Sequence, residues 1–319
     1  MKKFSMIHKD AAVRKNSSSG GAFTCITDCV FDRYDNVAVW GCVLNEDNEA
    51  VHVRATDRRG RDAMCGSKYI SSDPGNTFSG VRQDLETGCF VVFSGTPCQV
   101  AGLLSFLQVT GTNTEHLLTI DFVCHGVASN AFFADYLQHM EQKYKGKVVA
   151  CRFRAHAQPG KKQDMELIFA NGKKYNAPST HHDWFYSVYL QNLMLRPSCY
   201  CCPYTTPDRA ADITLADDWS VRDRDASLVF LRTPEALALL PYLQGAMEIR
   251  EYETHQDIPN LSHPTSLPPR YEAFWNTYRN GGYLAAQTFV GNNTFKGKLK
   301  YCAAKWADKL HIRDWVKKR

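Results

Sequence analysis

The sequence FVVFS at residues 90–94 is an uninterrupted apolar stretch, and it runs directly into the turn sequence GTPCQ at residues 95–99. A second apolar stretch, LTIDFV at residues 118–123, runs in the same way into CHG at residues 124–126. Between them, residues 100–107 have the apolar spacing of a helix. A strand–helix–strand order is typical of parallel strands, so we expect the carboxyl ends of these two strands to share one edge of a sheet.

The same patterns extend along the chain in both directions. Further helices are expected at 22–34, 77–86, 131–144, 181–195 and 234–243, and further strands at 37–44, 50–55, 148–154, 165–169, 173–175, 213–215 and 227–231. These elements predict an α/β fold, with a mixed, partly parallel sheet flanked by helices and a helical C-terminal appendage. The expected organisation is a core at residues 1–255, a linker at 256–269 and a basic helical segment at 270–319.

The composition is that of a globular protein. Hydrophobic residues make up 44% and charged residues 22% of the 319 residues, which excludes a disordered, collagen-like or coiled-coil chain. The N-terminal segment has lysines but not the apolar region of a signal peptide, and no apolar run approaches the length of a membrane span. We therefore expect a cytoplasmic protein with reduced thiols, and a disulfide-rich secreted protein is a distant alternative.

The net charge of +5 is concentrated in the C-terminal segment. Residues 296–319 contain nine Lys or Arg and two Asp, with apolar residues at helical spacing between them. Such a helix could contact the inner face of an anionic membrane or a partner protein, or it could simply pack on its own domain. No basic and aromatic groove motif occurs in the body of the chain, so a nucleic-acid partner is not expected.

Twelve cysteines are the unusual feature of the composition. Cys199 and Cys202 form a C-x-x-C pair that can chelate one centre, and Cys98 and Cys124 each lie just past a predicted strand. Four thiolates suit a [4Fe–4S] cluster or zinc, and two single cysteines at strand ends favour the cluster. The alternative is that Cys98 and Cys124 are small buried hydrophobic residues.

The other cysteines are expected to have different roles. Cys65 and Cys201 could each replace one of the four proposed ligands. Six lie on predicted helix or strand faces and are expected in the core, namely Cys25, Cys29, Cys42, Cys89, Cys151 and Cys302.

Several further residues have types and positions that suit a binding site. The SSSGG sequence at residues 17–21 begins a predicted helix, where hydroxyl groups, main-chain N–H groups and the helix dipole favour a phosphate, although serine is also an ordinary helix cap. Lys68 lies in a glycine-flanked loop as a binding cation or a surface lysine. Asp217 follows a predicted strand and could contact a ligand or cap the next turn, and His125 could donate a proton.

Six of these motifs occur in an order that resembles the coenzyme F420 hydrogenase/dehydrogenase beta-subunit family. They are SSSGG at 17–21, GSKY at 66–69, GTPCQ at 95–99, VCHG at 123–126, PSCYCCPY at 197–204 and DITLAD at 212–217. The resemblance covers about residues 15–245. It implies that residues 1–255 are a mixed α/β flavoprotein oxidoreductase core, which carries FAD and a [4Fe–4S] cluster and exchanges electrons with a deazaflavin or another reducible ring.

The resemblance also assigns residues to each group. It implies a cluster on Cys98, Cys124, Cys199 and Cys202, and FAD contacts from Ser18, Ser19, Gly20, Gly21, Lys68, Gly95, Thr96 and Gln99. The expected catalytic residues are His125 and Asp217.

The sequence departs from the family pattern in two respects. It contains no C-x₂-C-x₂-C-x₃-C run, which implies a bacterial member without the N-terminal ferredoxin domain and a separate ferredoxin-like partner for electron transfer. Ala216 and Asp218 stand where the family usually has Gly and Phe, which would alter the flavin or substrate pocket. Relatives among polysaccharide-biosynthesis genes imply a sugar-linked substrate. The alternative function is a non-redox accessory protein whose four-cysteine metal centre is structural, and bound flavin distinguishes the two.

Overall fold

The structure is a computed structural model that describes residues 1–155, 164–177, 183–221, 225–253 and 258–291, together with Leu299 and Ala303. The chain forms two compact units, each assembled from separate stretches. Unit 1 consists of Met1–Lys68, Ser72–His125 and Cys201–Pro264, and unit 2 consists of Tyr69–Ser71, Gly126–Tyr200 and Thr265–Arg319. The expected core at 1–255 and the expected linker at 256–269 thus each contribute residues to both units.

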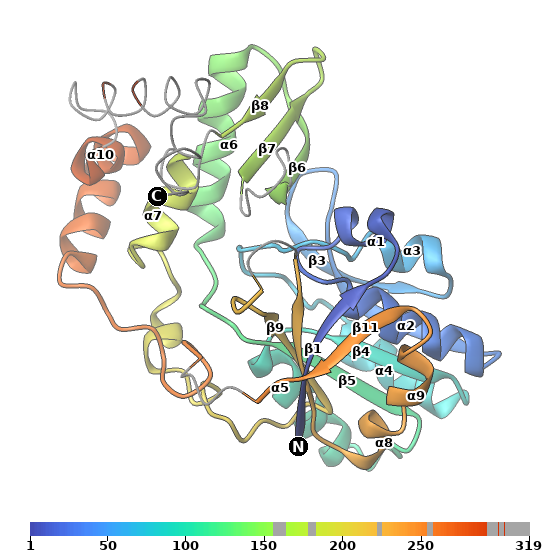
Figure 1. Ribbon diagram of the computed structural model, residues 1–319. Coiled ribbons are helices and arrows are strands. Elements are labelled where there is room, and N and C mark those ends of the chain that lie inside the picture. The colour runs from blue at the N-terminus through green and yellow to red at the C-terminus, as the bar shows by residue number, and fades with distance from the viewer. Residues whose placement is uncertain are drawn as a thin grey trace. The chain divides into compact units, whose positions relative to one another are not determined.

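Unit 1 is built on an eight-stranded sheet with the strand order β11-β1-β10-β9-β5-β4-β2-β3 (Figure 1). In chain order the strands are β1 (Lys2–His8), β2 (Val37–Leu44), β3 (Ala50–Ala55), β4 (Phe90–Ser94), β5 (Leu117–Phe122), β9 (Ile213–Asp217), β10 (Ser227–Leu231) and β11 (Met247–Glu251). The neighbours among β2, β4, β5 and β9 pair in parallel. All other neighbouring pairs are antiparallel. This mixed sheet with flanking helices confirms the predicted α/β class.

Helices pack on both faces of this sheet because alternate strand residues point to opposite sides. Val39 and Val92 join one apolar cluster with Ile26 of helix α2, and Ala38 and Val91 join another with helices α4 and α5. The helices of unit 1 are α1 (Ala11–Asn16), α2 (Ala22–Arg33), α3 (Arg58–Asp62), α4 (Thr77–Glu86), α5 (Pro97–Val109), α8 (Pro234–Leu237) and α9 (Leu240–Leu243). The sheet is therefore a buried layer, which explains the continuous apolar stretches of its parallel strands.

Unit 2 contains a three-stranded antiparallel sheet, β6-β7-β8, beside helix α6 (Figure 1). Its elements are α6 (Asn130–Tyr144), β6 (Val148–Ala155), β7 (Asp164–Phe169), β8 (Lys174–Asn176), α7 (Trp184–Leu190) and α10 (Tyr271–Val290), and the 3₁₀ helix η1 (Pro197–Cys201) crosses into unit 1. A fully buried carboxylate, Asp183, accepts hydrogen bonds from the Tyr136 and Tyr175 hydroxyls at 2.8 and 3.1 Å. Burial raises its pKa, and its partners make it a structural link between α6 and β8.

The structure corrects some of the predicted elements. The helix expected at 181–195 is only Trp184–Leu190, because Asp183 caps its start and Asn192, with φ of 60°, leaves the helical conformation after its end. The helix expected at 234–243 is two short helices, since Pro241 cannot donate the hydrogen bond that would continue the first. Strands β1 and β11 were not predicted.

Two expectations concern segments at the end of the chain. The basic segment 296–319 lies outside the described residues except for Leu299 and Ala303, and Cys302 lies outside them too. Helix α10 confirms a helix in the expected C-terminal appendage. Among the residues that are described, no helix combines the length and apolarity needed to cross a bilayer.

Candidate functional site

Two predicted motifs do meet at one edge of the sheet of unit 1. Strands β4 and β5 are parallel neighbours, with Ser94 opposite Ile120 near their carboxyl ends. The turn at residues 95–99 and the cysteine Cys124 therefore follow these strands at the same edge, as expected from the sequence. Cys98 is exposed there and Cys124 is half-buried, so neither is a fully buried hydrophobic residue.

The turn at residues 95–99 is held by the capping box of helix α5. The side-chain oxygen Oε1 of Gln99 accepts hydrogen bonds from the Thr96 main-chain N–H and from the Thr96 hydroxyl, both at 3.0 Å. The amide nitrogen of the same Gln99 donates to the Ser72 hydroxyl at 2.8 Å, and the Thr96 hydroxyl lies 3.1 Å from Cys98 Sγ. Gln99 thus fixes the turn through its side-chain oxygen, and through its side-chain nitrogen it links the turn to the loop that carries Lys68.

The serine-rich motif and the Lys68 loop also lie together, although 49 residues separate Ser18 from Ser67. The Ser18 hydroxyl accepts hydrogen bonds from the main-chain N–H and the hydroxyl of Ser67, at 2.7 and 2.8 Å. The neighbouring Ser19 hydroxyl donates to the Ala226 carbonyl at 2.6 Å. The motifs that contain Ser18, Lys68 and Gln99 are therefore joined by two sets of side-chain hydrogen bonds.

The two glycines of the serine-rich motif are required by the geometry. A Cβ atom on Gly20 would lie 2.2 Å from the Met6 carbonyl and 2.5 Å from the Ser227 nitrogen, so only glycine fits between β1 and β10. Gly21 is the N-cap of α2 with φ of 87°, a left-handed conformation that favours glycine. It makes no side-chain cap, so the main-chain N–H groups of the first turn of α2 lack an acceptor from that position.

Lys68 is an ammonium group in buried surroundings. Its Nζ donates to the Met64 and Cys65 carbonyls at 2.7 and 3.1 Å. Burial lowers the pKa of Lys68, and the nearby Cys42 and Cys65 thiols partly oppose that shift. Within the described part of the chain, no carboxylate lies at ion-pair distance from Lys68, so an anionic ligand group would be a natural counter-ion.

The two expected catalytic residues belong to unit 1 at different points of the sheet. His125 follows Cys124, and its Nδ1 lies 3.4 Å from Asn260 Oδ1. Asp217 is the last residue of β9 and pairs with Ser227 of β10, next to the close approach of Gly20. His125 is therefore placed near the predicted cluster ligand Cys124, and Asp217 near the serine-rich motif.

The neighbouring Asp218 is almost fully buried, at 1% exposure. Its Oδ1 accepts hydrogen bonds from the Ser220 N–H and hydroxyl at 2.9 and 2.6 Å, whereas its Oδ2 has no partner among the described residues. Its main-chain N–H donates to the Ala226 carbonyl, which also accepts from Ser19. This departure from the family pattern therefore places a buried carboxylate beside the serine-rich motif.

The sequence did not identify Arg209, whose guanidinium connects the end of β5 with the loop that contains Asn260. Arg209, whose side chain is 1% exposed, donates to Asp121 Oδ2 at 3.3 Å and to the carbonyls of Phe122 and Asn260 at 3.0 Å each. These acceptors belong to the end of β5, just before Cys124, and to the loop that carries the partner of His125. An aspartate within the apolar strand 118–123 was the available signal, since a buried carboxylate needs a cationic or hydrogen-bonding partner.

The burial of the cysteines separates them largely as expected. The proposed ligands are exposed (Cys98) or half-buried (Cys124, Cys199 and Cys202). Of the expected core cysteines, Cys25, Cys29, Cys89 and Cys151 are buried, and Cys42 is half-buried. Burial raises the pKa of Cys25 to about 12 and also raises that of Cys151, which disfavours the thiolate form that binds a metal.

The proposed cluster ligands come from both units, with Cys199 in unit 2 and the other three in unit 1. Within unit 2, a Cβ atom on Gly126 would lie 3.2 Å from the Cys199 Cβ, and Gly126 has φ of 122°. Cys199 therefore packs against a glycine that is only two positions after Cys124 in the chain. In the described residues, no group of three His, Cys, Asp or Glu side chains is close enough to hold a metal ion. The accessible thiols fit a thiolate ligand set in type, and their role stays a prediction.

A comparison with known protein families shows to which family the chain belongs. Residues 90–256, more than half of the chain, match the carboxyl-terminal part of the family described as "Coenzyme F420 hydrogenase/dehydrogenase, beta subunit". The chain belongs to this family. The predicted resemblance is thereby confirmed, and the matched region begins at strand β4 and includes both strand-end cysteines and the C-x-x-C pair.

One solved structure has a similar fold over nearly the whole chain. It is a chain of the F420-reducing [NiFe] hydrogenase complex from Methanosarcina barkeri, in a xenon-derivatised form. The similarity has a TM-score of 0.54 at 16% sequence identity, and it covers 91% of this chain and 90% of that chain. No curated protein matches the chain. At this level of identity, the structural similarity establishes the fold.

Proposed function

We propose that this protein is an iron–sulfur flavoprotein oxidoreductase that uses FAD and a [4Fe–4S] cluster. Its substrate would be a deazaflavin such as coenzyme F420 or another reducible ring. The observation that carries this proposal is the hydrogen-bonded assembly of Ser18, Ser67 and the Gln99 turn beside the strand ends of β4 and β5, in a chain that belongs to the F420 hydrogenase beta-subunit family. Strand ends of this kind are where α/β proteins bind cofactors.

The residues of the assembly suit the parts of FAD. The first turn of α2 offers main-chain N–H groups without a side-chain cap at Gly21, and Lys68 offers a cation that lacks an acidic partner among the described residues. Both would stabilise the anionic diphosphate or an anionic flavin ring. The turn formed by Gly95, Thr96 and Gln99 would fix the position of the ring, because its capping box leaves it little freedom.

The proposed chemistry divides between the bound groups and the protein. When bound, FAD exchanges two electrons and a proton as hydride with the reducible ring, and the cluster passes the electrons singly to or from a separate carrier. Cys98, Cys124, Cys199 and Cys202 would hold the cluster as thiolates. His125 and Asp217 would hold or release protons near these groups, and the Asn260 side chain would orient the His125 ring.

The electron carrier, the cellular location and a second candidate substrate are also proposals. The electron carrier would be a ferredoxin-like protein, and the structural similarity to a chain of a hydrogenase complex supports work with other subunits. We place the protein in the cytoplasm, with the segment 296–319 as its contact with a partner or with the inner face of the membrane. A sugar-linked substrate in polysaccharide biosynthesis is a second candidate for the reducible group.

Anaerobic purification tests the proposal directly. We expect a brown protein with about four irons per chain, bound flavin, and absorbance that bleaches on reduction with dithionite. Cys202→Ser should remove the cluster absorbance, whereas Cys201→Ser, one position earlier and exposed, should retain it. A colourless protein with one zinc and no flavin would instead support the accessory protein with a structural four-cysteine centre.

A further inference from the structure

Helix α2 begins with main-chain N–H groups that lack an acceptor. Cys25 is the first residue of the helix whose N–H is bonded, and it donates to the Gly21 carbonyl at 3.2 Å. The N–H groups of residues 22–24 have no acceptor in the described part of the chain, because the N-cap is a glycine. These groups and the helix dipole attract an anion, although a helix start of this kind is also an ordinary structural feature.

His8, the last residue of strand β1, lies against this helix start. A Cβ atom on Gly21 would lie 3.0 Å from the Cβ and 3.6 Å from the Cγ of His8, so the imidazole packs beside the N-cap. The His8 main-chain N–H donates to the Gly20 carbonyl at 2.8 Å, which fixes the end of β1 to the turn. With an exposure of 8%, His8 is held in place by the packing of unit 1.

One ring nitrogen of His8 is occupied and the other is available. Nδ1 accepts a hydrogen bond from the Asp10 main-chain N–H at 3.1 Å. A proton on Nδ1 would face the proton of that N–H, so this bond selects the tautomer that carries its proton on Nε2. Nε2 has no partner among the described residues, yet it is not one of the enclosed polar atoms that lack a partner. The ring therefore presents an N–H donor that a ligand can reach.

The charges around His8 also favour an anion. Arg14 Nη1 donates to the carbonyls of His8 and Lys9 at 2.5 and 2.8 Å, which places a guanidinium next to this strand end. Within the described residues, neither Arg14 nor Lys9 forms an ion pair. The acidic residue beside them is Asp10, whose Oδ1 accepts from the Ala12 N–H at 2.7 Å as the cap of α1. Two cations and one carboxylate thus surround the imidazole.

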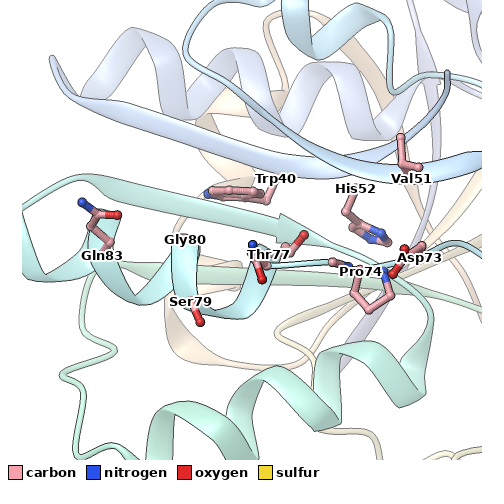
Figure 2. A pocket seen from close by; sticks show the side chains of 11 residues that line it. Trp40, Val51, His52, Asp73, Pro74, Thr77, Ser79, Gly80 and Gln83 are labelled. Atoms are coloured by element: carbon pink, nitrogen blue, oxygen red, sulfur yellow. Dashed lines mark hydrogen bonds between the residues drawn. The ribbon is translucent and has the colours of Figure 1, made fainter. Parts of the chain in front are cut away.

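Helix α4 also begins without a side-chain cap, but the groups around its start differ (Figure 2). A pocket of about 500 Å³ lies there, between α4 and strands β2 and β3. Its lining residues, all of which are described, include the carboxylate of Asp73 and no Lys or Arg. His52 lines the pocket as well, but both of its ring nitrogens are enclosed. Of these two helix starts, α2 is therefore the one that suits a phosphate.

We propose that His8 is a phosphate-binding residue, whose Nε2–H donates to a phosphate oxygen of a ligand held at the start of α2. The inference rests on the proposed function and deepens it where the ligand is FAD, since the FAD diphosphate is one source of the phosphate. Another phosphorylated ligand is the second source, and both present the same oxygens. A hydrogen bond to a charged oxygen is stronger than one between neutral groups, so loss of this donor should be measurable.

Calorimetric titration of the full-length protein, freed of bound flavin, with inorganic pyrophosphate tests this role. His8→Gln retains an amide N–H near the position of Nε2, whereas His8→Asn retains an amide oxygen near the position of Nδ1. We expect His8→Asn to weaken pyrophosphate binding about tenfold, or about 1.4 kcal/mol, and His8→Gln to remain within about threefold of wild type. If His8 only held the Asp10 main chain, the order of the two variants would be reversed, and the proposal would be wrong.

Two further variants control the measurement. His116→Asn should bind pyrophosphate like wild type, because His116 stacks on Phe90 just before strand β5 and does not contact the start of α2. Thermal unfolding shows whether each variant is folded. His8→Leu, which also lacks the donor, replaces His8→Asn if that variant does not fold.

Titration with FAD and with riboflavin, which has no phosphate, identifies the source of the phosphate. If it belongs to FAD, His8→Asn weakens the binding of FAD but not that of riboflavin. If wild type binds pyrophosphate through His8 but does not bind FAD, the ligand is another phosphorylated molecule and the proposed flavin function fails alone. The role of His8 is overturned if pyrophosphate does not bind wild type, or binds His8→Asn equally well. FAD binding by wild type then decides the proposed function separately.

Discussion

Arg209 allows a quantitative test of how the carboxyl edge of β5 is held together. Its guanidinium and the Asp121 carboxylate are each 1% exposed, so neither charge is solvated when the other is removed. Loss of one partner from such a buried pair costs about 3–5 kcal/mol, because the remaining charge stays in a poorly solvating interior. Arg209→Met should therefore lower the free energy of unfolding by about that amount at pH 7, measured by urea unfolding and circular dichroism.

The pKa of Asp121 predicts how the stability deficit of Arg209→Met changes with pH. Burial raises the pKa of Asp121 above its ordinary 3.8, although the nearby Thr214 hydroxyl and the Arg209 charge oppose the shift. Removal of Arg209 takes away one of the opposing causes, so the pKa of Asp121 rises further. A carboxyl group whose folded-state pKa is raised destabilises the fold increasingly as the pH rises from its unfolded-state pKa to its folded-state pKa, and the penalty disappears as the pH falls below the unfolded-state value. The stability deficit of Arg209→Met should shrink as the pH is lowered from 7 toward 4.

The double variant isolates the charge from the packing. Asp121→Asn combined with Arg209→Met removes both charges, and it should recover more than half of the stability that Arg209→Met loses. A deficit below about 1 kcal/mol at pH 7, or one that grows in acid, would refute the reasoning. In that case the side-chain contacts of Arg209 would be ordinary surface interactions.

Two further predictions concern the proposed FAD contacts. Gly20→Ala should prevent stable folding or cost several kcal/mol, because its Cβ would lie 2.2 Å from the Met6 carbonyl, whereas Gly245→Ala, with its nearest neighbour at 3.9 Å, should be tolerated in the same thermal-unfolding assay. Since burial lowers the pKa of Lys68 below its ordinary 10.5, wild type should gain stability relative to Lys68→Met as the pH rises from 7 toward 10.5. Urea unfolding at pH 7 and 10 measures this, and an equal difference at both pH values would contradict it.

The parallel part of the sheet could be predicted because its sequence carries a local signal. Strands β2 and β4 pair in parallel and have the predicted bounds, since strands covered on both faces are continuous apolar runs. Strands β1 and β11 were missed for the opposite reason. Strand β1 begins with charged residues and pairs with strands more than 200 positions later, and such pairing leaves no periodic signal in the local sequence.

The candidate site was predictable as a set of motifs but not as a network of contacts. Turn composition and strand ends located the Gly95 turn and Cys124, because these features depend on a few neighbouring residues. The hydrogen bonds from Ser67 to Ser18 and from Arg209 to Phe122 join positions 49 and 87 residues apart. Chain folding alone determines which side chains meet over such distances, so one sequence could not reveal them.

These contacts also revise how the serine-rich motif would bind a phosphate. The sequence suggested that its hydroxyl groups contribute directly, yet Ser18 accepts two hydrogen bonds from Ser67, and Ser19 donates its proton to Ala226. A hydroxyl that has already donated its proton cannot donate it again to a phosphate oxygen. Ser19 is therefore excluded as a donor and holds the turn against β10, whereas Ser18 only accepts and keeps its own proton. The groups left for an anion are the main-chain N–H groups of α2, the ammonium of Lys68 and the Ser18 hydroxyl. The two motifs thus form one binding unit, in which Ser19 positions the turn and the main-chain N–H groups, Lys68 and Ser18 can bind the anion.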